Sequence, residues 1–201
     1  MSTSMWDERY AGDGYLFGTD PAGFLLGQAH HLAPGRALAV ADGEGRNSVF
    51  LAQQGLSVTG FDASPVAVDK ARRLAEARGV KVDFNVSDVD SWDWEPEAFD
   101  TVVAIFIQFA GPQMRDEIFD GMKRTLKPGG KLLLHGYRPE QLDYGTGGPP
   151  KAENMYTIEL LEEAFGDLQI LRLEAYDREI TEGTGHAGMS ALIDLIAQKA
   201  S

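Results

Sequence analysis

A glycine-rich run after a strand-like apolar segment is the first feature that could bind a ligand. Residues 41–47 read Ala-Asp-Gly-Glu-Gly-Arg-Asn, and a helical pattern follows them. A strand that runs into a glycine turn and then into a helix aims several backbone N–H groups at one point, and glycine lets a ligand approach the backbone closely. Because a glycine pair in this position is also a common tight turn, the run needs support from residues elsewhere.

Two aspartates give that support, because each follows another predicted strand. Asp62 ends the second strand and Asp88 follows the third. A carboxylate after the second strand can accept hydrogen bonds from both hydroxyls of a ribose, and open parallel sheets bind ligands outside the carboxyl ends of their strands. Each aspartate alone could be a helix cap. The glycine turn and the two aspartates together predict a site for a nucleoside-containing ligand.

The pattern departs from two other nucleotide-binding motifs. A dinucleotide fingerprint needs a third glycine where this chain has Ser48, and no Tyr-x-x-x-Lys pair for hydride-transfer chemistry occurs in the sequence. The triphosphate-binding loop G-x-x-x-x-G-K-[ST] is also absent. A nicotinamide-dependent dehydrogenase remains an alternative, which NADH fluorescence on mixing would test.

The elements that must position these residues alternate between strand and helix. Ser64 followed by Pro65 predicts a helix start, with serine as the N-cap and proline in the first turn. A turn at residues 127–130 precedes the fifth strand, and a glycine-rich connection at 181–189 predicts a long antiparallel hairpin. We expect strands at residues 37–41, 56–61, 80–86, 99–106, 131–135, 168–180 and 190–199, and helices at 48–54, 64–78, 113–126 and 156–165.

This order predicts an α/β fold with five β–α units and a terminal hairpin. We expect a doubly wound, seven-stranded, mostly parallel sheet with a reversed last strand. A length of 201 residues fits one domain over residues 1–201. Within it, residues 1–20 would form an N-terminal cover segment, and residues 138–150, rich in glycine and proline, would form a lid loop.

The motif residues resemble a known family of enzymes. Class I S-adenosylmethionine-dependent methyltransferases carry sequences similar to Gly43-Glu44-Gly45-Arg46-Asn47-Ser48, Leu51-Ala52, Val58-Thr59-Gly60-Phe61-Asp62 and Leu126-Lys127-Pro128-Gly129-Gly130. The Gly-Glu-Gly-Arg-Asn form, with Trp6-Asp7-Glu8-Arg9-Tyr10 and Tyr15-Leu16-Phe17-Gly18, resembles a narrower branch, the small tellurite-resistance and thiopurine-methyltransferase-like enzymes. The resemblance runs over nearly the whole chain and implies a Rossmann-like methyltransferase fold and S-adenosyl-L-methionine as the cofactor.

The resemblance also implies roles for individual residues. Residues 41–47 would wrap the methionine part of the cofactor, Asp62 would hold the ribose, Asp88 would meet the adenine amino group, and Ile105 would lie beside the adenine or the sulfonium. The family usually has an acidic residue and a glycine where this chain has Ala39 and Ala41, so Asp42 or Arg9 would take over contacts to the methionine amino or carboxylate group. The full predicted cofactor set is Arg9, Ala41, Asp42, Gly43, Gly45, Arg46, Asn47, Asp62, Ala63, Ser64, Asp88, Val89 and Ile105.

The methyl acceptor would enter where four segments surround the site. These segments, residues 6–20, 106–112, 136–156 and 181–189, are rich in aromatic side chains, and such a wall suits a small apolar or polarizable molecule. By analogy with the family we expect a soft nucleophile, a thiol or a chalcogen compound. The candidate catalytic residues are His186, Tyr144 and Arg138. Since a thiol with a pKa of ~8.5 is partly ionised at neutral pH, none of the three is expected to be an indispensable base.

Composition limits the other classes of function. The chain has no cysteine, which excludes disulfides, thiolate zinc sites and cysteine nucleophiles, and its four histidines lack metal-ligand spacing, so no metal site is expected. A net charge of -13 disfavours nucleic acid and anionic membranes as partners. The sequence has no long apolar stretch and no signal-peptide pattern, so we expect a cytoplasmic enzyme with a small-molecule substrate. The oligomeric state stays open.

Two further alternatives share the predicted cofactor. The chain could be an O- or N-methyltransferase of a small metabolite, which an essential base near the sulfonium would indicate. It could also be a non-catalytic S-adenosylmethionine-binding protein. Cofactor binding without consumption of any acceptor would favour that possibility.

Overall fold

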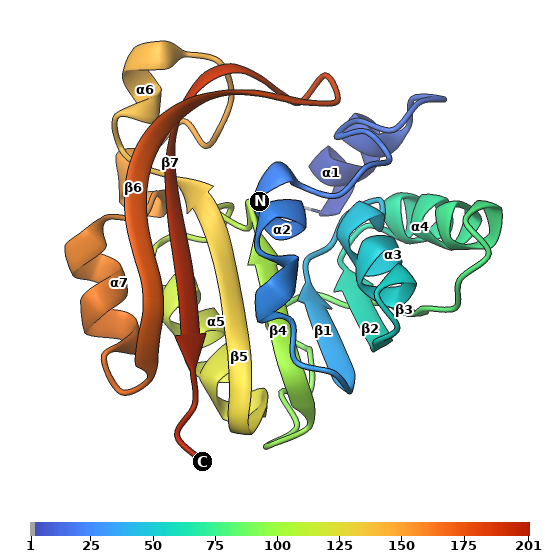
Figure 1. The fold of residues 1–201 in the computed structure, drawn as a ribbon. Helices are drawn as coiled ribbons and strands as arrows, with labels where there is room; N and C mark the ends of the chain where they lie inside the picture. Colours follow the sequence, from blue (N-terminus) through green and yellow to red (C-terminus); the bar gives the residue numbers. More distant parts are fainter. Residues whose placement is uncertain (1–2) are drawn as a thin grey trace.

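The computed structural model describes residues 3–201 and is built on one seven-stranded sheet (Figure 1). The strand order is β3-β2-β1-β4-β5-β7-β6, with β7 antiparallel to both of its neighbours and the first five strands parallel. This confirms the predicted sheet and its reversed last strand. The strands are β1 (Arg36–Val40), β2 (Ser57–Asp62), β3 (Asp83–Val86), β4 (Phe99–Ile105), β5 (Leu126–Tyr137), β6 (Gln169–Glu182) and β7 (His186–Gln198).

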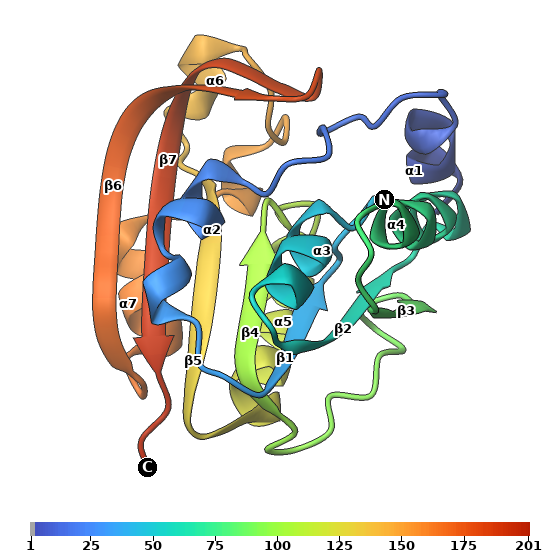
Figure 2. The same cartoon turned by 45° about the vertical axis from the view of Figure 1, so that its right-hand side comes forward.

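Helices cover both faces of the sheet, as a doubly wound fold requires (Figures 1 and 2). On one face α2, α3 and α4 pack against the strands, and on the other face α5 and α7 do. The helices are α1 (Thr3–Tyr10), α2 (Gly23–Gly27), α3 (Arg46–Gln53), α4 (Pro65–Ala77), α5 (Pro112–Thr125), α6 (Gln141–Tyr144) and α7 (Ile158–Phe165), with short 3₁₀ helices η1 (Ala29–His31) and η2 (Ala152–Asn154).

The alternation of side chains along the strands sorts the core into these two layers. On β1, Ala37 packs with Phe50 and Leu51 of α3, whereas Leu38 and Val40 pack on the opposite face with residues of α5. Successive side chains of a strand point to opposite faces of the sheet, so a strand covered on both sides is apolar throughout. This explains why residues 37–40 of β1 are apolar without interruption.

Several element boundaries differ from the sequence prediction; for example, β3 begins at Asp83, three residues later than predicted. α3 begins at Arg46, two residues early, because Gly45 takes the N-cap position in the left-handed region (φ 86°). β5 begins at Leu126, so residues 127–130 form a bulge inside the strand, opposite Asp100, and are not a turn ahead of it. The hairpin strands β6 and β7 are longer than predicted, which leaves residues 183–185 as the connection.

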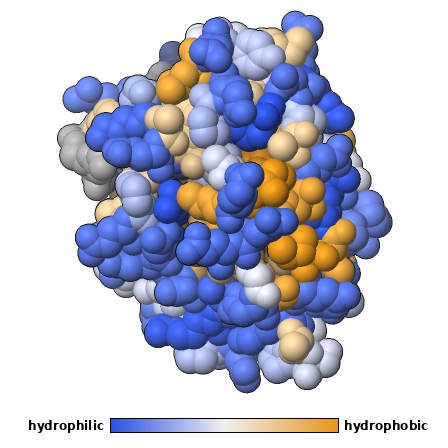
Figure 3. All heavy atoms as spheres, turned by 90° about the vertical axis from the view of Figure 1, so that its left-hand side faces the viewer, coloured by the Kyte–Doolittle hydropathy of each residue, from blue (hydrophilic) through white to orange (hydrophobic). Residues whose placement is uncertain are grey.

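The strand at the free edge of the sheet carries many charged side chains, although its Leu173, Tyr176 and Ile180 pack against the core. β6 carries Arg172, Glu174, Asp177, Arg178 and Glu179, and the side of the molecule that it forms with α7 and α6 is largely hydrophilic, with one apolar patch (Figure 3). Charged side chains on an edge strand oppose pairing with another chain. Within residues 3–201 no helix combines the length and apolar character that crossing a membrane requires.

We predict that Gly45 is fixed by packing as well as by its backbone angle. A Cβ at Gly45 would lie 2.5 Å from the Cβ of Ala71 on α4, whereas a Cβ at Gly55, which also has a left-handed φ, would meet nothing within 4 Å. Both alanine variants bear the left-handed cost of ~1–2 kcal/mol, and Gly45→Ala adds an overpacking cost of ~1–3 kcal/mol. In urea denaturation, Gly45→Ala should therefore lower the free energy of unfolding more than Gly55→Ala does. Equal losses would contradict the packing argument.

Candidate active site

A cavity of about 460 Å³ opens at the carboxyl ends of the parallel strands. It runs across the sheet edge from β3 and β2, through β1 and β4, to β5 and β7, and α1 closes one side of it. The residues that line it are Met5, Trp6, Arg9, Tyr10, Phe17, Val40, Ala41, Asp42, Gly43, Arg46, Asn47, Phe61, Asp62, Ala63, Ser87, Asp88, Val89, Val103, Ile105, Phe106, Gln108, Phe109, Met114, Tyr137, Gly147, Gly148, Pro149, Pro150, Gly185 and His186.

The turn after β1 forms the floor of this cavity. Ala41 has a left-handed φ of 46°, and a second non-glycine residue at the cavity, Phe106 after β4, has a φ of 56°. Such angles cost of order 1–3 kcal/mol and cluster at functional sites. Gly43 also has a positive φ, and a Cβ there would lie 2.8 Å from the Tyr10 hydroxyl of α1. The glycine thus lets the N-terminal helix close onto the turn.

The carboxylate of Asp42 lies at the cavity wall, and one of its oxygens lacks a hydrogen-bond partner within residues 3–201. Its Oδ2 atom is buried and has no hydrogen-bond partner among the described residues. Burial raises the pKa of Asp42 to about 7, although the neighbouring Ser48 and the charge of Arg46 oppose the shift. A buried carboxylate with a free oxygen fits a cationic ligand group, such as the ammonium of a methionine moiety.

Asp62 lies at the end of β2 and is held by two backbone groups. The N–H of Gly43 donates to Oδ2 and the N–H of Ser64 donates to Oδ1, both at 2.9 Å. Burial raises the pKa of Asp62, and these two hydrogen bonds oppose the shift. Each carboxylate oxygen keeps further lone-pair capacity, so the group can still accept hydrogen bonds from two ribose hydroxyls.

The β3 end of the cavity has the character of a nucleobase site. Asp88 is exposed at the rim, Val89 is buried beside it, and Ile105 is half-buried at the end of β4. A flat apolar slot with a carboxylate at its edge suits an adenine with its exocyclic amino group. Within residues 3–201, the histidine, aspartate and glutamate side chains form no group of three that could hold a metal ion.

The charged residues of the glycine-rich run hold the N-terminal segment in place. Glu44 and Lys70 form a buried ion pair at 2.9 Å. Glu44 also accepts from the N–H of Leu16 at 2.7 Å, and Lys70 donates to the carbonyl of Gly14 at 2.6 Å. Residues 14–16 are therefore fastened to the glycine turn and to α4, in part by Glu44 of the run 41–47 that the resemblance assigned to the methionine part of the cofactor.

A second buried ion pair joins the same segment to the terminal hairpin. Arg46 pairs with Glu182 of β6 at 2.6 Å and donates to the carbonyl of Phe17. Asn47 accepts from the N–H of Ala22 through its side-chain oxygen. Arg46 and Asn47 line the cavity as predicted, yet these polar groups are engaged with the N-terminal segment. No local signal in the sequence pairs Arg46 with a residue of the last hairpin.

The opposite end of the cavity is aromatic and centres on His186. Its ring stacks between Phe17, with centroids 4.4 Å apart, and Phe106, with centroids 4.2 Å apart. Its Nδ1 lies 2.6 Å from the hydroxyl of Tyr137. Burial lowers the pKa of His186 to about 3, helped by the charge of Arg46, so the imidazole is neutral at physiological pH.

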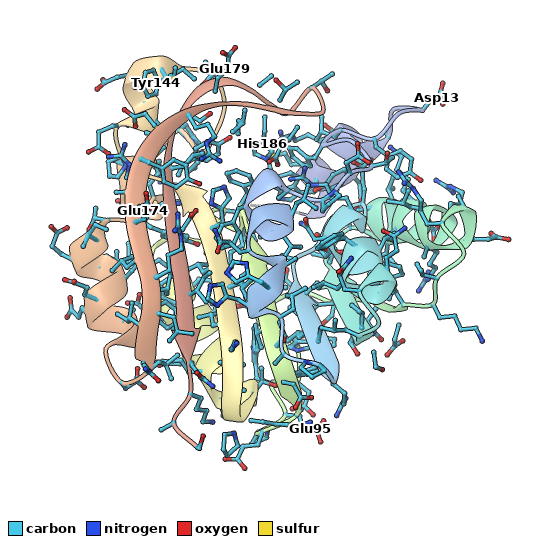
Figure 4. All side chains as sticks on the ribbon, in the orientation of Figure 1. Asp13, Glu95, Tyr144, Glu174, Glu179 and His186 are labelled. Atoms are coloured by element: carbon cyan, nitrogen blue, oxygen red, sulfur yellow. The ribbon has the colours of Figure 1, made fainter. Side chains whose placement is uncertain are left out.

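Four predicted site residues lie elsewhere. Tyr144 and Arg138 both bond Asp177 of β6 outside the cavity lining, and Figure 4 shows Tyr144 on α6 at the outer side, away from His186. The helix α6 turns this part of the predicted lid loop outward, so the prediction that these two side chains face the acceptor is wrong. Gly45 and Ser64 are also absent from the lining. Gly45 packs on α4, and Ser64 caps α4 by accepting from the N–H of Ala67.

Sequence reasoning missed Gln108, which is buried beside the cavity. Its side-chain amide pairs with both backbone groups of Tyr137: it donates to the carbonyl at 2.7 Å and accepts from the N–H at 2.6 Å. A glutamine just beyond a buried strand is the only signal that could have suggested it. Of the other histidines, His135 packs in the core beside Phe24 and bonds Asp194.

Comparison with known proteins agrees with this geometry. A family model described as a methyltransferase domain matches residues 37–130. Residues 37–130 are therefore similar to a methyltransferase domain, and the segment contains the glycine turn, Asp62 and Asp88. One solved structure with a similar fold is described as a magnesium protoporphyrin IX methyltransferase from Synechocystis with bound SAH (TM-score 0.66, 16% identity, 98% of this chain and 83% of that chain). These similarities support the class I, S-adenosylmethionine-dependent assignment made from the sequence, and the narrower branch stays a prediction.

Curated proteins to which this chain is similar have names that indicate different acceptors. They include a demethylmenaquinone methyltransferase of Thermus thermophilus (34% identical, 53% of this chain and 49% of that protein), a ubiquinone biosynthesis O-methyltransferase of Xanthomonas euvesicatoria pv. vesicatoria (38%, 51% and 43%) and a probable thiol methyltransferase 2 of Arabidopsis thaliana (32%, 59% and 52%). The chain spans about half the length of the curated relatives it matches.

A solved structure shows that the fold extends beyond the matched segment. It bears the description "Conversion of a Disulfide Bond into a Thioacetal Group during Echinomycin Biosynthesis", and the superposition has a TM-score of 0.81 over 98% of this chain and 91% of that chain. Sequence identity is 19%. This neighbour therefore shows the fold of nearly the whole chain.

We predict that the affinity for the cofactor product depends on pH through Asp42. Below pH 7 the carboxyl of the ligand-free protein is mostly protonated and cannot pair with an ammonium, so binding must expel a proton. Calorimetry with S-adenosylhomocysteine should give an affinity roughly tenfold lower at pH 6 than at pH 8. The Asp42→Asn variant should bind more weakly and show little change between these pH values. A wild-type affinity that is constant over this range would contradict the role.

Proposed function

We propose that this chain transfers the methyl group of S-adenosylmethionine to a small soft nucleophile, a thiol or a chalcogen compound. The observation that carries the proposal is the acceptor end of the cavity, where the described lining residues include one imidazole that is neutral and no free carboxylate. Burial also raises the pKa of Tyr137, so this phenol keeps its proton. An acceptor that ionises by itself near neutral pH needs no base from the protein.

The cofactor would lie along the sheet edge with its two ends held by carboxylates. We assign the ribose to Asp62, the adenine to the slot beside Asp88 and Val89, and the methionine ammonium to Asp42. Arg9, on α1 at the cavity wall, is assigned to the methionine carboxylate. This places the sulfonium methyl group near Ile105 and Phe106, facing the aromatic end.

The protein's contribution to such a reaction is position and exclusion of water. The sulfonium is intrinsically reactive, so the domain must hold the nucleophile and the methyl group in line and keep bulk water out. Phe17, Phe106, Phe109 and Pro149 supply apolar walls for that purpose. The N-terminal segment, residues 1–20, is held by Glu44 and Arg46 and would cover the site. We propose that it belongs to a single domain over residues 1–201.

Oxygen or nitrogen acceptors form the second candidate. The ubiquinone biosynthesis relative favours an oxygen acceptor, and the probable thiol methyltransferase favours sulfur. The tellurite-resistance and thiopurine-methyltransferase-like branch is our preference, because its acceptors need no protein base. A net charge of -13 supports a small-molecule substrate over nucleic acid, and we propose a cytoplasmic location because the chain lacks cysteine.

The test is a panel of thiol, selenide, tellurite and phenol acceptors assayed for release of S-adenosylhomocysteine. We expect turnover of the thiol and chalcogen compounds, with a rate that rises with pH along the acceptor's own ionisation. Turnover of the phenol alone would favour the oxygen acceptor. Binding of the cofactor with no acceptor consumed would leave a non-catalytic S-adenosylmethionine-binding protein.

We predict that Asp62 contributes to cofactor affinity through hydrogen bonds to a charged acceptor. Such bonds contribute about 1.5–3 kcal/mol, so Asp62→Ala should weaken the binding of S-adenosylhomocysteine roughly ten- to a hundredfold in calorimetry. Asp62→Asn, which keeps one acceptor oxygen for the backbone, controls for damage to the turn. Asp69→Ala, at an exposed position of α4, should bind normally. If Asp62→Ala binds S-adenosylhomocysteine as tightly as the wild type, the assignment of Asp62 to the ribose is wrong.

A further inference from the structure

The hydrogen bond between Tyr137 and His186 fixes which ring nitrogen of the histidine carries the proton. The Tyr137 hydroxyl is buried, and its hydrogen needs an acceptor. His186 Nδ1 lies 2.6 Å from this hydroxyl. The Ser190 hydroxyl also lies near Tyr137, but it donates its own hydrogen to the carbonyl of Gly188, so His186 Nδ1 is the acceptor that the hydrogen bonds of the described residues offer. If Nδ1 carried the proton instead, the hydroxyl hydrogen would be left without a partner in a buried place, which is unfavourable. The satisfied arrangement therefore puts the imidazole proton on Nε2.

The surroundings hold both rings in this arrangement. Gln108 pairs with the backbone of Tyr137 on both sides, which sets the position of the phenol. Phe17 and Phe106 stack on the two faces of the imidazole and leave its edge free. The Nε2 atom makes no hydrogen bond to another described residue, and His186 lines the cavity. In Figure 4 its side chain lies between the hairpin and the N-terminal helices, over the carboxyl edge of the sheet.

We propose that Tyr137 holds His186 in the Nε2–H form, and that His186 donates this N–H to an anionic methyl acceptor in the cavity. The inference rests on the proposed function and names the form of substrate that the site takes: a thiolate or another ionised chalcogen group. Tyr137 is then a positioning residue, and His186 is a substrate-contacting residue that does not act as a base.

The charges in the reaction balance without a proton transfer. A lone pair of the anionic acceptor forms the new bond to the methyl carbon, and the bond from that carbon to the cofactor sulfur breaks with its electron pair going to the sulfur. The sulfonium becomes the neutral thioether of S-adenosylhomocysteine, and the acceptor becomes a neutral methylated product. Because the product has lost its negative charge, its hydrogen bond to Nε2–H is weaker than that of the substrate, which favours product release.

The tautomer can be tested without any activity. In protein labelled with ¹⁵N-histidine, long-range ¹⁵N–¹H correlation spectra distinguish the two nitrogens, and we expect His186 to carry its proton on Nε2 at pH 7. Tyr137→Phe should give a mixture of tautomers. A His186 signal with the proton on Nδ1, or on both nitrogens, would overturn the proposal. This result stands apart from the proposed function, since it needs no acceptor.

Kinetics with a thiol acceptor test the contact to substrate. His186→Ala should raise KM for the thiol roughly ten- to a hundredfold, with unchanged affinity for S-adenosylhomocysteine. His186→Gln, whose side-chain amide offers an N–H donor of similar reach, should recover most of the loss. His30→Ala, at an exposed histidine outside the cavity, is the matched control and should behave as wild type.

Two kinetic outcomes would contradict the donor role. One is a His186→Gln variant as impaired as His186→Ala. The other is a loss confined to kcat that grows as pH falls below the acceptor pKa, because a base would produce it. If every acceptor fails while the spectra show Nε2–H, the proposed function fails, and the donor assignment to a methyl acceptor fails with it.

Discussion

Two buried ion pairs connect the turn at the start of α3 to α4 and to the terminal hairpin. Glu44 pairs with Lys70, and Arg46 pairs with Glu182. Burying charges is costly unless each is paired and its remaining hydrogen-bonding groups are satisfied. Here the second oxygen of Glu44 and the second nitrogen of Arg46 bond the N-terminal segment. Removal of one partner would leave an uncompensated charge, so the turn, the segment and the hairpin form one interdependent unit.

Two of the three non-glycine residues with left-handed backbone angles in residues 3–201 lie at this edge of the sheet, and the third is Glu97 ahead of β4. Ala41 and Phe106 both adopt left-handed backbone angles where β1 and β4 end. Residues in such angles persist only when the structure around them over-determines their position. Ala41 stands where the resembling family usually has glycine. The surrounding anchors therefore supply a geometry that glycine would adopt without strain.

The electrostatic character of the cavity changes along its length. Carboxylates of Asp42, Asp62 and Asp88 lie toward the β1, β2 and β3 end, where a cationic cofactor with a ribose and an adenine would lie. The β5 and β7 end is aromatic around a neutral His186. A sulfonium bound between the two ends would be attracted by the carboxylates on one side. On the other side the aromatic wall has a low dielectric, so the positive charge of the sulfonium would attract an anionic acceptor strongly.

The sequence by itself determined the sheet, its order of elements and the edge at which the predicted cofactor residues meet. Strand alternation, the Ser64-Pro65 helix start and the aspartates after β2 and β3 are local signals, and parallel topology brings their ends to one edge. The sequence also pointed to His186, because a glycine-rich connection between two strands must form a tip.

Only the tertiary structure decided the partners of these residues. Arg46 and Glu182 lie 136 positions apart, and Tyr137 and His186 lie 49 apart. These contacts depend on β7 inserting between β5 and β6 and on how far the hairpin reaches over the edge. The local pattern of apolar residues does not reveal contacts between residues so far apart in the sequence. Tyr144 and Arg138 were misplaced for the same reason: the side of a loop that faces a cavity is set by the helix α6 and by Asp177 of a strand far along the chain.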